Sequence, residues 1–375
     1  MRTFALESLY IIRYKVVFLT NNERMKIVCD NKIPYIYPAL RQLADDVVML
    51  PGREISPADV HEADILVVRT RTRCDRHLLH HSSVRLVVTA TIGYDHLDTH
   101  WLESHGIAWA NCPGCNAHSV AQYVQCSLLQ LKRQRGVDLA QSVLGIVGVG
   151  HVGSAVLETA LKMGLKRILL CDPPRQAAGE AAPEGMEWST MQRLEQEADI
   201  ITFHTPLTSE GPYPTLHLAD ERFFQALGQR PGRVIINAAR GGVVDEEALL
   251  RAMDEGVVRE AVIDTWEGEP AIRRELLQRA FIATPHIAGY SADGKANATR
   301  QTLRHVCRML LRPMTFEVHA PSLPADFQPS ADPEELALQL YDPLADTLRL
   351  RTSPEDFERL RGDYPLRREY AEMAK

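Results

Sequence analysis

The sequence predicts an α/β protein with two doubly wound parallel-sheet domains and a small C-terminal module. Short β-branched segments alternate with helical patterns along most of the chain, and this alternation is typical of β-α-β units. The segments are nearly continuous in apolar residues, as expected for parallel strands that are covered on both faces. A length of 375 residues is sufficient for two or three domains with cores of their own.

The expected strands form two series, and each series predicts one sheet. The first series comprises 26–30, 46–50, 64–69, 85–90 and 107–110. The second series comprises 142–147, 167–172, 199–204, 233–239, 259–266 and 280–284. An amphipathic helix at about 116–135 separates them and ends at Gly136, because glycine readily adopts the left-handed conformation that stops a helix. A further helical pattern covers 246–256.

The two ends of the chain differ from its middle. Residues 313–375 contain a proline-rich and acidic stretch followed by a charged helical pattern. We expect a small module there that gains stability by docking on another subunit. Met25 is followed at once by the first expected strand, so we interpret residues 1–24 as an extension that precedes the functional start. Arg13 and Lys15 interrupt its apolar stretch, which argues against a signal peptide.

Composition excludes several classes of partner. The net charge of −7 and the isoelectric point of about 6.1 argue against a nucleic-acid partner, because phosphate contacts need a clustered surplus of Lys and Arg. We find no run of about 18 apolar residues, so we expect no helix that spans a membrane. The seven cysteines are scattered through apolar segments, which indicates a reducing, cytoplasmic environment.

One cysteine pair leaves an alternative open. Cys112 and Cys115 have the spacing of a redox motif, and His118 lies nearby, so a metal site is also conceivable. Structural zinc normally takes four protein ligands, however, and a redox pair usually begins a helix of a thioredoxin-like unit. We therefore expect neither a metal nor a redox centre here.

A glycine-rich loop at 145–153 predicts a dinucleotide site. Gly148, Gly150 and Gly153 have G-x-G-x-x-G spacing, after an expected strand and at the start of a helix. In this motif the first glycine permits a tight turn, the second lets the backbone approach the pyrophosphate, and the third lets helix and strand pack closely. The N-terminus of the helix then attracts the negative charge.

The next strand ends in an acidic residue, Asp172. A carboxylate at this place accepts hydrogen bonds from the ribose hydroxyls and repels a 2′-phosphate, so we predict NAD as the cofactor. Arg175, three residues later, could instead bind that phosphate, and NADP is the alternative.

Three residues at expected strand ends of the second series have the properties that oxidation of a hydroxy acid needs. His286 is suited to remove the hydroxyl proton, because imidazole titrates near neutral pH. Glu269 would stabilise the imidazolium ion. Arg240 would hold a substrate carboxylate and polarise the developing carbonyl group.

In this order and in these contexts, Arg240, Glu269 and His286 resemble the catalytic residues of the D-isomer-specific 2-hydroxyacid dehydrogenase family. The resemblance implies a substrate domain split between 25–115 and 286–312, with an inserted Rossmann NAD-binding domain at 116–285. It implies that the three residues are catalytic. It also implies cofactor contacts from Gly148, Gly150, His151, Val152, Gly153, Asp172, Thr205, Ala238, Ala239, Arg240, Asp264 and Gly289.

Further stretches resemble one branch of this family, whose members oxidise 4-phospho-D-erythronate at C2 in pyridoxal 5′-phosphate biosynthesis. They include "PGCNA" at 113–117, "GPYPTLHLAD" at 211–220 and "TPHIAGYS" at 284–291. The branch implies a homodimer that forms through the C-terminal module. A dehydrogenase for 3-phosphoglycerate and a dinucleotide-sensing corepressor of the same fold are the alternatives.

Such a substrate has a carboxylate and a phosphate, so it needs a second anion site. The stretch "LVVRTRTR" at 66–73 ends an expected strand, and we predict substrate contacts from Arg69, Thr70, Arg73, Thr91 and Tyr290. We expect that Arg71 only solvates the strand end. Arg367 or Arg368 of a partner subunit is a further candidate for the phosphate.

Overall fold

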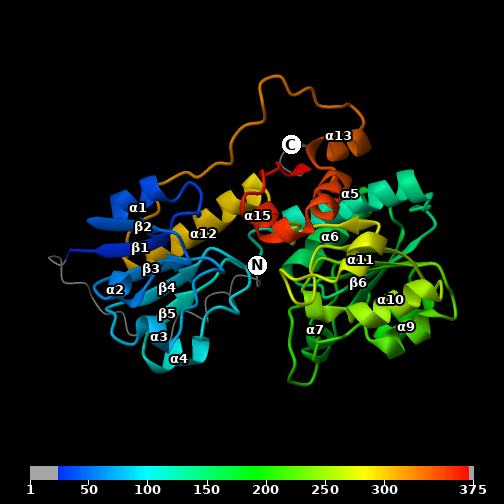
Figure 1. Ribbon diagram of the computed structural model, residues 1–375, viewed down its shortest axis with the longest axis horizontal. Coiled ribbons are helices and arrows are strands. Elements are labelled where there is room, and N and C mark those ends of the chain that lie inside the picture. Colours follow the sequence, from blue (N-terminus) through cyan, green and yellow to red (C-terminus); the bar gives the residue numbers. More distant parts are fainter. Residues whose placement is uncertain (1–23, 371–375) are drawn as a thin grey trace. The chain divides into compact units, whose positions relative to one another are not determined.

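The structure is a computed structural model that describes residues 24–370, so the interpretation of the N-terminal extension lies outside the described residues. The chain forms two compact units (Figure 1). The first contains the described residues up to Cys115 together with Asp293–Pro321, and the second contains Asn116–Ala292 together with the residues from Ser322 onward.

The first unit is built on a parallel sheet with the strand order β2-β1-β3-β4-β5. Its strands are β1 (Lys26–Asp30), β2 (Asp46–Leu50), β3 (Ile65–Val68), β4 (Leu86–Thr89) and β5 (Ala108–Ala110). Its helices are α1 (Tyr37–Leu43), α2 (Pro57–Val60), α3 (Arg76–Leu79), α4 (Thr99–Ser104) and most of α12 (Ala292–Met309). These strands confirm the first predicted series within two residues at each end.

Both faces of this sheet are buried, which explains the continuous apolar runs. Ile27 on β1 packs in one core cluster with side chains of α1 and α12. Val28, the next residue, packs in another cluster with side chains of α2, α3 and α4. Successive side chains of a strand point to opposite faces. When both faces are buried, apolar residues therefore occupy successive positions and no polar residues alternate with them.

The second unit contains a parallel sheet with the order β11-β10-β9-β8-β6-β7. Its strands are β6 (Val143–Val147), β7 (Arg167–Cys171), β8 (Ile200–Phe203), β9 (Arg233–Asn237), β10 (Val258–Ile263) and β11 (Ile282–Ala283). The chain runs from β6 outward to β7 and then returns to the other side of β6 with β8. In such sheets, ligands bind beyond the carboxyl ends of the strands at this reversal.

Helices cover both faces of the second sheet (Figure 1). They are α5 (Ala117–Arg135), α6 (His151–Lys162), α7 (Pro173–Ala177), α8 (Met191–Glu197), α9 (Glu221–Leu227), α10 (Glu246–Asp254) and α11 (Arg274–Arg279), with a 3-10 turn η1 (Gly241–Val243). Gly136 ends α5 in the left-handed conformation, with φ at 66°, as predicted.

The expected C-terminal module at 313–375 is not a separate unit: residues 313–321 belong to the first unit, and the segment from Ser322 onward belongs to the second. This segment contains α13 (Pro333–Leu340), α14 (Pro343–Thr352), a 3-10 turn η2 (Pro354–Asp356) and α15 (Phe357–Gly362). Leu350 and Phe357 are fully buried in one core cluster of this unit, and Tyr341 is buried in the other. These short helices have too few apolar residues for a core of their own and therefore use the core of the larger sheet.

Candidate active site

The glycine-rich loop has the geometry that a dinucleotide requires. Gly148 has φ at +84°, and a Cβ there would lie 2.9 Å from the carbonyl of His204. A Cβ on Gly153 would lie 2.0 Å from the carbonyl oxygen of Gly148, so the start of α6 packs directly on the turn. A Cβ on Gly150 would meet nothing within 4 Å, which leaves this backbone accessible to a ligand. The loop therefore fits a pyrophosphate group.

The groups around this loop are consistent with a cofactor site. Thr205 contacts Gly148, and its buried Oγ1 has no hydrogen-bond partner within the described chain. Asp172 caps α7 and accepts a hydrogen bond from the backbone N–H of Val149 at 2.8 Å. Its contact with a ribose stays a prediction. Arg175 donates to Glu180 at 2.8 Å, so its charge is already compensated by a carboxylate.

The topology of the sheet brings the three predicted catalytic residues to neighbouring strand ends. Arg240 follows β9, Glu269 follows β10, and His286 follows β11, and these strands are adjacent in the sheet. Because all three strands are parallel, their carboxyl ends lie on the same edge. Arg240 is half-buried, and its Nη1 donates to the backbone carbonyl of Ala239 at 2.8 Å.

His286 and Glu269 form a close pair. The distances from His286 Nδ1 to the two carboxylate oxygens are 3.0 and 2.8 Å, and the side chains are 25% and 16% exposed. The bond engages Nδ1 and leaves Nε2 as the ring nitrogen for a substrate proton. Glu269 also accepts a bond from the backbone N–H of Trp266 and lies 3.4 Å from Arg361. Burial alone would raise the pKa of Glu269, but the interactions with His286, Trp266 and Arg361 lower it.

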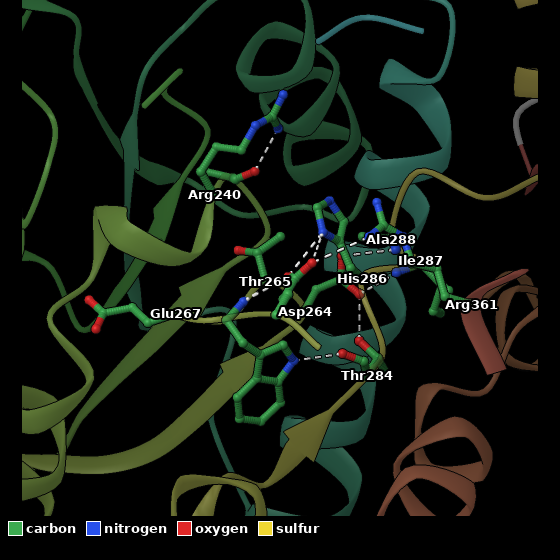
Figure 2. A network of polar contacts seen from close by, with 12 residues as sticks. Arg240, Asp264, Thr265, Glu267, Thr284, His286, Ile287, Ala288 and Arg361 are labelled. Carbon is green, nitrogen blue, oxygen red and sulfur yellow. Dashed lines mark hydrogen bonds and ion pairs between the residues drawn. The ribbon is translucent and has the colours of Figure 1, made fainter. Parts of the chain in front are cut away.

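The backbone of His286 has an unusual conformation, with φ at +56°. Asp264 supports the chain on both sides of it (Figure 2). One carboxylate oxygen accepts bonds from the hydroxyl of Thr284 at 2.7 Å and the N–H of Ile287 at 2.8 Å, and the other accepts from the N–H of Ala288 at 3.0 Å. Asp264 is 1% exposed, and both of its carboxylate oxygens are occupied by these bonds, so its contact with a cofactor stays a prediction.

The remaining predicted cofactor residues lie at the ends of the same elements. His151 and Val152 begin α6, exposed and half-buried respectively. Ala238 and Ala239 directly follow β9. Gly289 lies so close to Asn116 that a Cβ there would meet the amide nitrogen at 2.2 Å. Their contacts with a cofactor stay predictions.

The arginine-rich stretch lies at the carboxyl end of β3 in the first unit. Arg69 donates to the fully buried Asp30 at 3.1 Å and is itself 21% exposed. Arg73 is 77% exposed and bonds to Asp75 at 2.9 Å. Arg71 is half-buried, so Arg73, and not Arg71, is the arginine most exposed to solvent, which corrects our expectation. Asp30 was missed; it is the last residue of β1, which is adjacent to β3 in the sheet, and its charge alone does not indicate its partner.

The other predicted substrate residues have identified partners. Thr91 is half-buried, and its hydroxyl donates to the carbonyl of Gly93 at 2.8 Å, whereas Thr70 is exposed. Tyr290 is half-buried in the second unit, and its ring packs edge-to-face on that of Tyr364. Their contacts with substrate stay predictions.

The two cysteines with redox spacing are both buried. Burial raises the pKa of Cys112 to about 11, which is opposite to the shift that makes a thiol reactive. Within residues 24–370, no group of three or more His, Cys, Asp or Glu side chains could hold a metal ion. Over the same residues, no helix is both long enough and apolar enough to cross a membrane.

Arg367 is not available to a phosphate of another subunit, whereas Arg368 is half-buried and its contact with the phosphate stays a prediction. Arg367 is 7% exposed, and its guanidinium group donates to the carbonyls of Ser119, Ile287 and Ala288 in its own unit. Arg361 was missed altogether. Its position in a charged helical pattern resembles that of any surface arginine, so the sequence contains no signal for its contact with Glu269.

The chain is similar to known dehydrogenases. Residues 116–288 match the NAD-binding domain of the D-isomer-specific 2-hydroxyacid dehydrogenases. The chain is 49% identical to erythronate-4-phosphate dehydrogenase of Bacteroides fragilis, over 92% of this chain and 97% of the relative. Relatives of the same name from Porphyromonas gingivalis and Escherichia coli are 43% and 41% identical, over 92% and 93% of this chain and 94% and 93% of the relatives.

The chain belongs to the erythronate-4-phosphate dehydrogenases.

As a member of this family, it is an NAD-dependent oxidoreductase with an NAD-binding domain, as predicted. Solved structures confirm the fold. D-mandelate dehydrogenase of Rhodotorula graminis has a TM-score of 0.66 at 21% identity and covers 80% of this chain and all of its own. D-lactate dehydrogenase of Aquifex aeolicus, solved with NAD and lactic acid, has a TM-score of 0.61 at 22% identity and covers 76% of this chain and 95% of its own.

Proposed function

We propose that the protein oxidises 4-phospho-D-erythronate at C2 to 2-oxo-3-hydroxy-4-phosphobutanoate in pyridoxal 5′-phosphate biosynthesis. The observation that carries the proposal is the pairing of His286 with Glu269 on the sheet edge where Arg240 also lies. The glycine-rich loop belongs to the same sheet, and the names of the relatives support the choice of substrate.

In this proposal, His286 is the general base. Its Nε2 accepts the proton of the C2 hydroxyl group, and Glu269 stabilises the imidazolium ion through Nδ1. NAD, when bound, supplies the acceptor for the hydride from C2. The lowered pKa of Glu269 favours its carboxylate form, which is the form that stabilises an imidazolium ion.

Arg240 binds the substrate carboxylate in this proposal. A guanidinium group can bind a carboxylate through two parallel hydrogen bonds, and it also stabilises the negative charge that develops on the C2 oxygen. The bond from Nη1 to the carbonyl of Ala239 holds the side chain near the end of β9. Its second terminal nitrogen and Nε are then the donors proposed to bind the carboxylate.

The cofactor would be held by the glycine-rich loop and the adjoining strand ends. The N–H groups at Gly150 and the start of α6 would bind the pyrophosphate, and Asp172 would bind the ribose. Thr205, with its unpartnered hydroxyl, would supply a hydrogen bond to the same ligand.

Arg69 is the best-supported candidate for the substrate phosphate. Its bond to Asp30 uses Nε and fixes the side chain, which leaves the two terminal nitrogens for an anion. Thr70, Thr91 and Tyr290 are proposed to contribute polar contacts. Arg73 would contribute less, because an exposed cation beside a carboxylate interacts only weakly with a further anion.

We further propose that the enzyme is a cytoplasmic homodimer that binds neither nucleic acid nor membrane. The resemblance of residues 313–375 to a dimerisation module supports the dimer. Light scattering that gives the mass of one chain would overturn the dimer.

The test of the proposed function is a comparison of initial rates with NAD. We expect turnover of 4-phospho-D-erythronate, with kcat/KM at least about 100-fold above that for unphosphorylated erythronate, because charge-assisted bonds to the phosphate are lost. A parallel assay with 3-phosphoglycerate tests the nearest alternative substrate. Equal rates with and without phosphate would exclude an anion site for this group, and binding of NADH without any turnover would indicate a sensor protein.

A further inference from the structure

The residues that follow His286 are held by an arginine from the far end of the chain. The N–H groups of Ile287 and Ala288 donate to Asp264, and their carbonyls accept bonds from Arg367 at 3.2 and 2.6 Å. Two consecutive residues are therefore bound through their N–H groups to a carboxylate and through their carbonyls to a guanidinium group.

Arg367 makes these bonds from a buried position. It is 7% exposed, its Nε donates to the side chain of Gln122 at 3.2 Å, and its guanidinium carbon lies 4.0 Å from the centre of the Tyr341 ring. Among the described residues no carboxylate forms an ion pair with it. Removal of a cation from water costs several kcal/mol, which the carbonyls and the aromatic ring must offset.

The neighbours of Arg367 bind the same loop. We define residues 364–369 as the C-terminal strap. The carbonyl of Arg367 accepts the N–H of Ala292 at 2.8 Å. Glu369 is 2% exposed and accepts the hydroxyl groups of Ser119 and Ser291 at 2.7 Å each. The strap therefore contacts the chain at both ends of the segment 287–292.

The backbone conformation of His286 has to be stabilised by its surroundings. A φ of +56° is unfavourable for a residue with a side chain, and such a conformation persists only where the surroundings enforce it. The direction of the His286 side chain follows from this backbone, and that direction brings Nδ1 within 2.8 Å of Glu269. Release of the next two residues would let the backbone relax and the imidazole turn away.

We propose that Arg367 is a positioning residue for His286, and that the C-terminal strap is an obligatory part of the active site in addition to any part it has in dimerisation. This inference rests on the proposed function, because it assigns His286 as the base. A side chain of methionine at 367 would fill the same space without bonds to the two carbonyls. Lysine would restore the charge but not the forked geometry.

The test compares Arg367→Met and Arg367→Lys with Arg359→Met. Arg359 belongs to the same C-terminal segment but is 64% exposed and bonds only within its own turn, to Asp356. We expect that Arg367→Met lowers kcat about 100-fold, since a displacement near 1 Å of a catalytic group has this effect. KM and the Kd of NADH should change less than about threefold, because substrate and cofactor contacts persist. Arg367→Lys should be intermediate, and Arg359→Met should equal the wild type.

Two further readouts separate positioning from a merely structural effect. The acid limb of the kcat/KM profile should move to lower pH in Arg367→Met, because the imidazolium loses support from Glu269. In histidine-labelled protein, the ring ¹⁵N shifts of His286, assigned with His286→Gln, should show that the proton is no longer confined to Nδ1.

Either of two results would overturn the inference. One is a folded Arg367→Met protein with unchanged kcat and unchanged ring shifts. The other is a parallel loss of kcat, NADH binding and folded protein, which indicates a structural effect alone. The ring shifts need no substrate, so they test the positioning even if 4-phospho-D-erythronate is not turned over by the wild type. That result would refute the proposed function instead.

Discussion

In the second unit, His286 is held by groups that are almost completely buried, whereas in the first unit the arginines after β3 are held at the edge of solvent. Asp264 and Arg367 are 1% and 7% exposed, but Arg69 and Arg73 are 21% and 77% exposed. The difference matches the two tasks proposed for these regions. A proton transfer depends on distances within fractions of an ångström, whereas an anion is attracted by charge over longer distances and tolerates a looser geometry.

The largest effect should come from His286, which is held by the buried groups of the second unit. We expect that His286→Gln lowers kcat about 1000-fold, because glutamine resembles the imidazole in size but cannot take up a proton. The Kd of NADH should be unchanged, since the glycine-rich loop is separate. The measurements are steady-state rates and fluorescence titration of NADH. A loss below tenfold would show that another group is the base.

A smaller effect is expected at the anion site. Removal of Arg69 alone would leave Asp30 as a buried, uncompensated carboxylate, so we choose the double variant Asp30→Asn/Arg69→Gln, which keeps a hydrogen bond between the two side chains. We expect that kcat/KM for 4-phospho-D-erythronate falls about 10-fold to 100-fold, since one set of charge-assisted bonds is lost.

The unphosphorylated acid provides the control for this variant. Its kcat/KM should be the same for the wild type and the double variant, because it has no group that needs Arg69. An equal loss for both acids would show that the double variant disturbs the fold of the first unit and that Arg69 does not bind the phosphate.

The second unit also contains a buried titratable group, Glu246, whose effect on stability can be measured. Burial raises the pKa of Glu246 to about 7, although its carboxylate accepts the N–H of Glu267 at 2.8 Å in the turn before Glu269. Because the folded state binds a proton that the unfolded state releases, the free energy of unfolding should fall as pH rises from about 4.5 to 7, by at most about 3 kcal/mol.

Glu246→Gln should remove most of this pH dependence, since glutamine does not ionise. Urea titrations of both proteins at pH 5 and pH 8 measure the difference. If the two proteins lose the same stability between these values, Glu246 is ionised in the folded protein throughout.

The smallest effect is expected at the most exposed arginine. Arg73→Met should change kcat/KM for 4-phospho-D-erythronate less than about twofold, because an exposed ion pair contributes little and is screened by salt. Rates at low and high salt provide the measurement. A loss comparable to that of the Arg69 double variant would mean that the phosphate is bound at Arg73 and that the solvent-facing arginine is functional.

The sheets, the glycine-rich loop and the catalytic pair could all be predicted because their signals are local. Parallel strands covered on both faces appear as apolar runs, and the strand-loop-helix pattern around Gly148 is contained in a short stretch. Arg361 and Asp30 could not be assigned in the same way. Their partners Glu269 and Arg69 lie far away in the sequence, and a charged residue looks the same whether it is solvated or paired.

The sequence by itself therefore determined the fold class, the NAD-binding domain and the proposal that His286 is the base, because spacing and residue type are informative where neighbouring residues act together. Only the tertiary structure decided that the C-terminal segment joins the NAD-binding unit and that Arg367 lies beneath the His286 loop. The physical reason is that a buried charge is stable only where several distant backbone and side-chain groups converge on it, and this convergence exists only once the chain has folded.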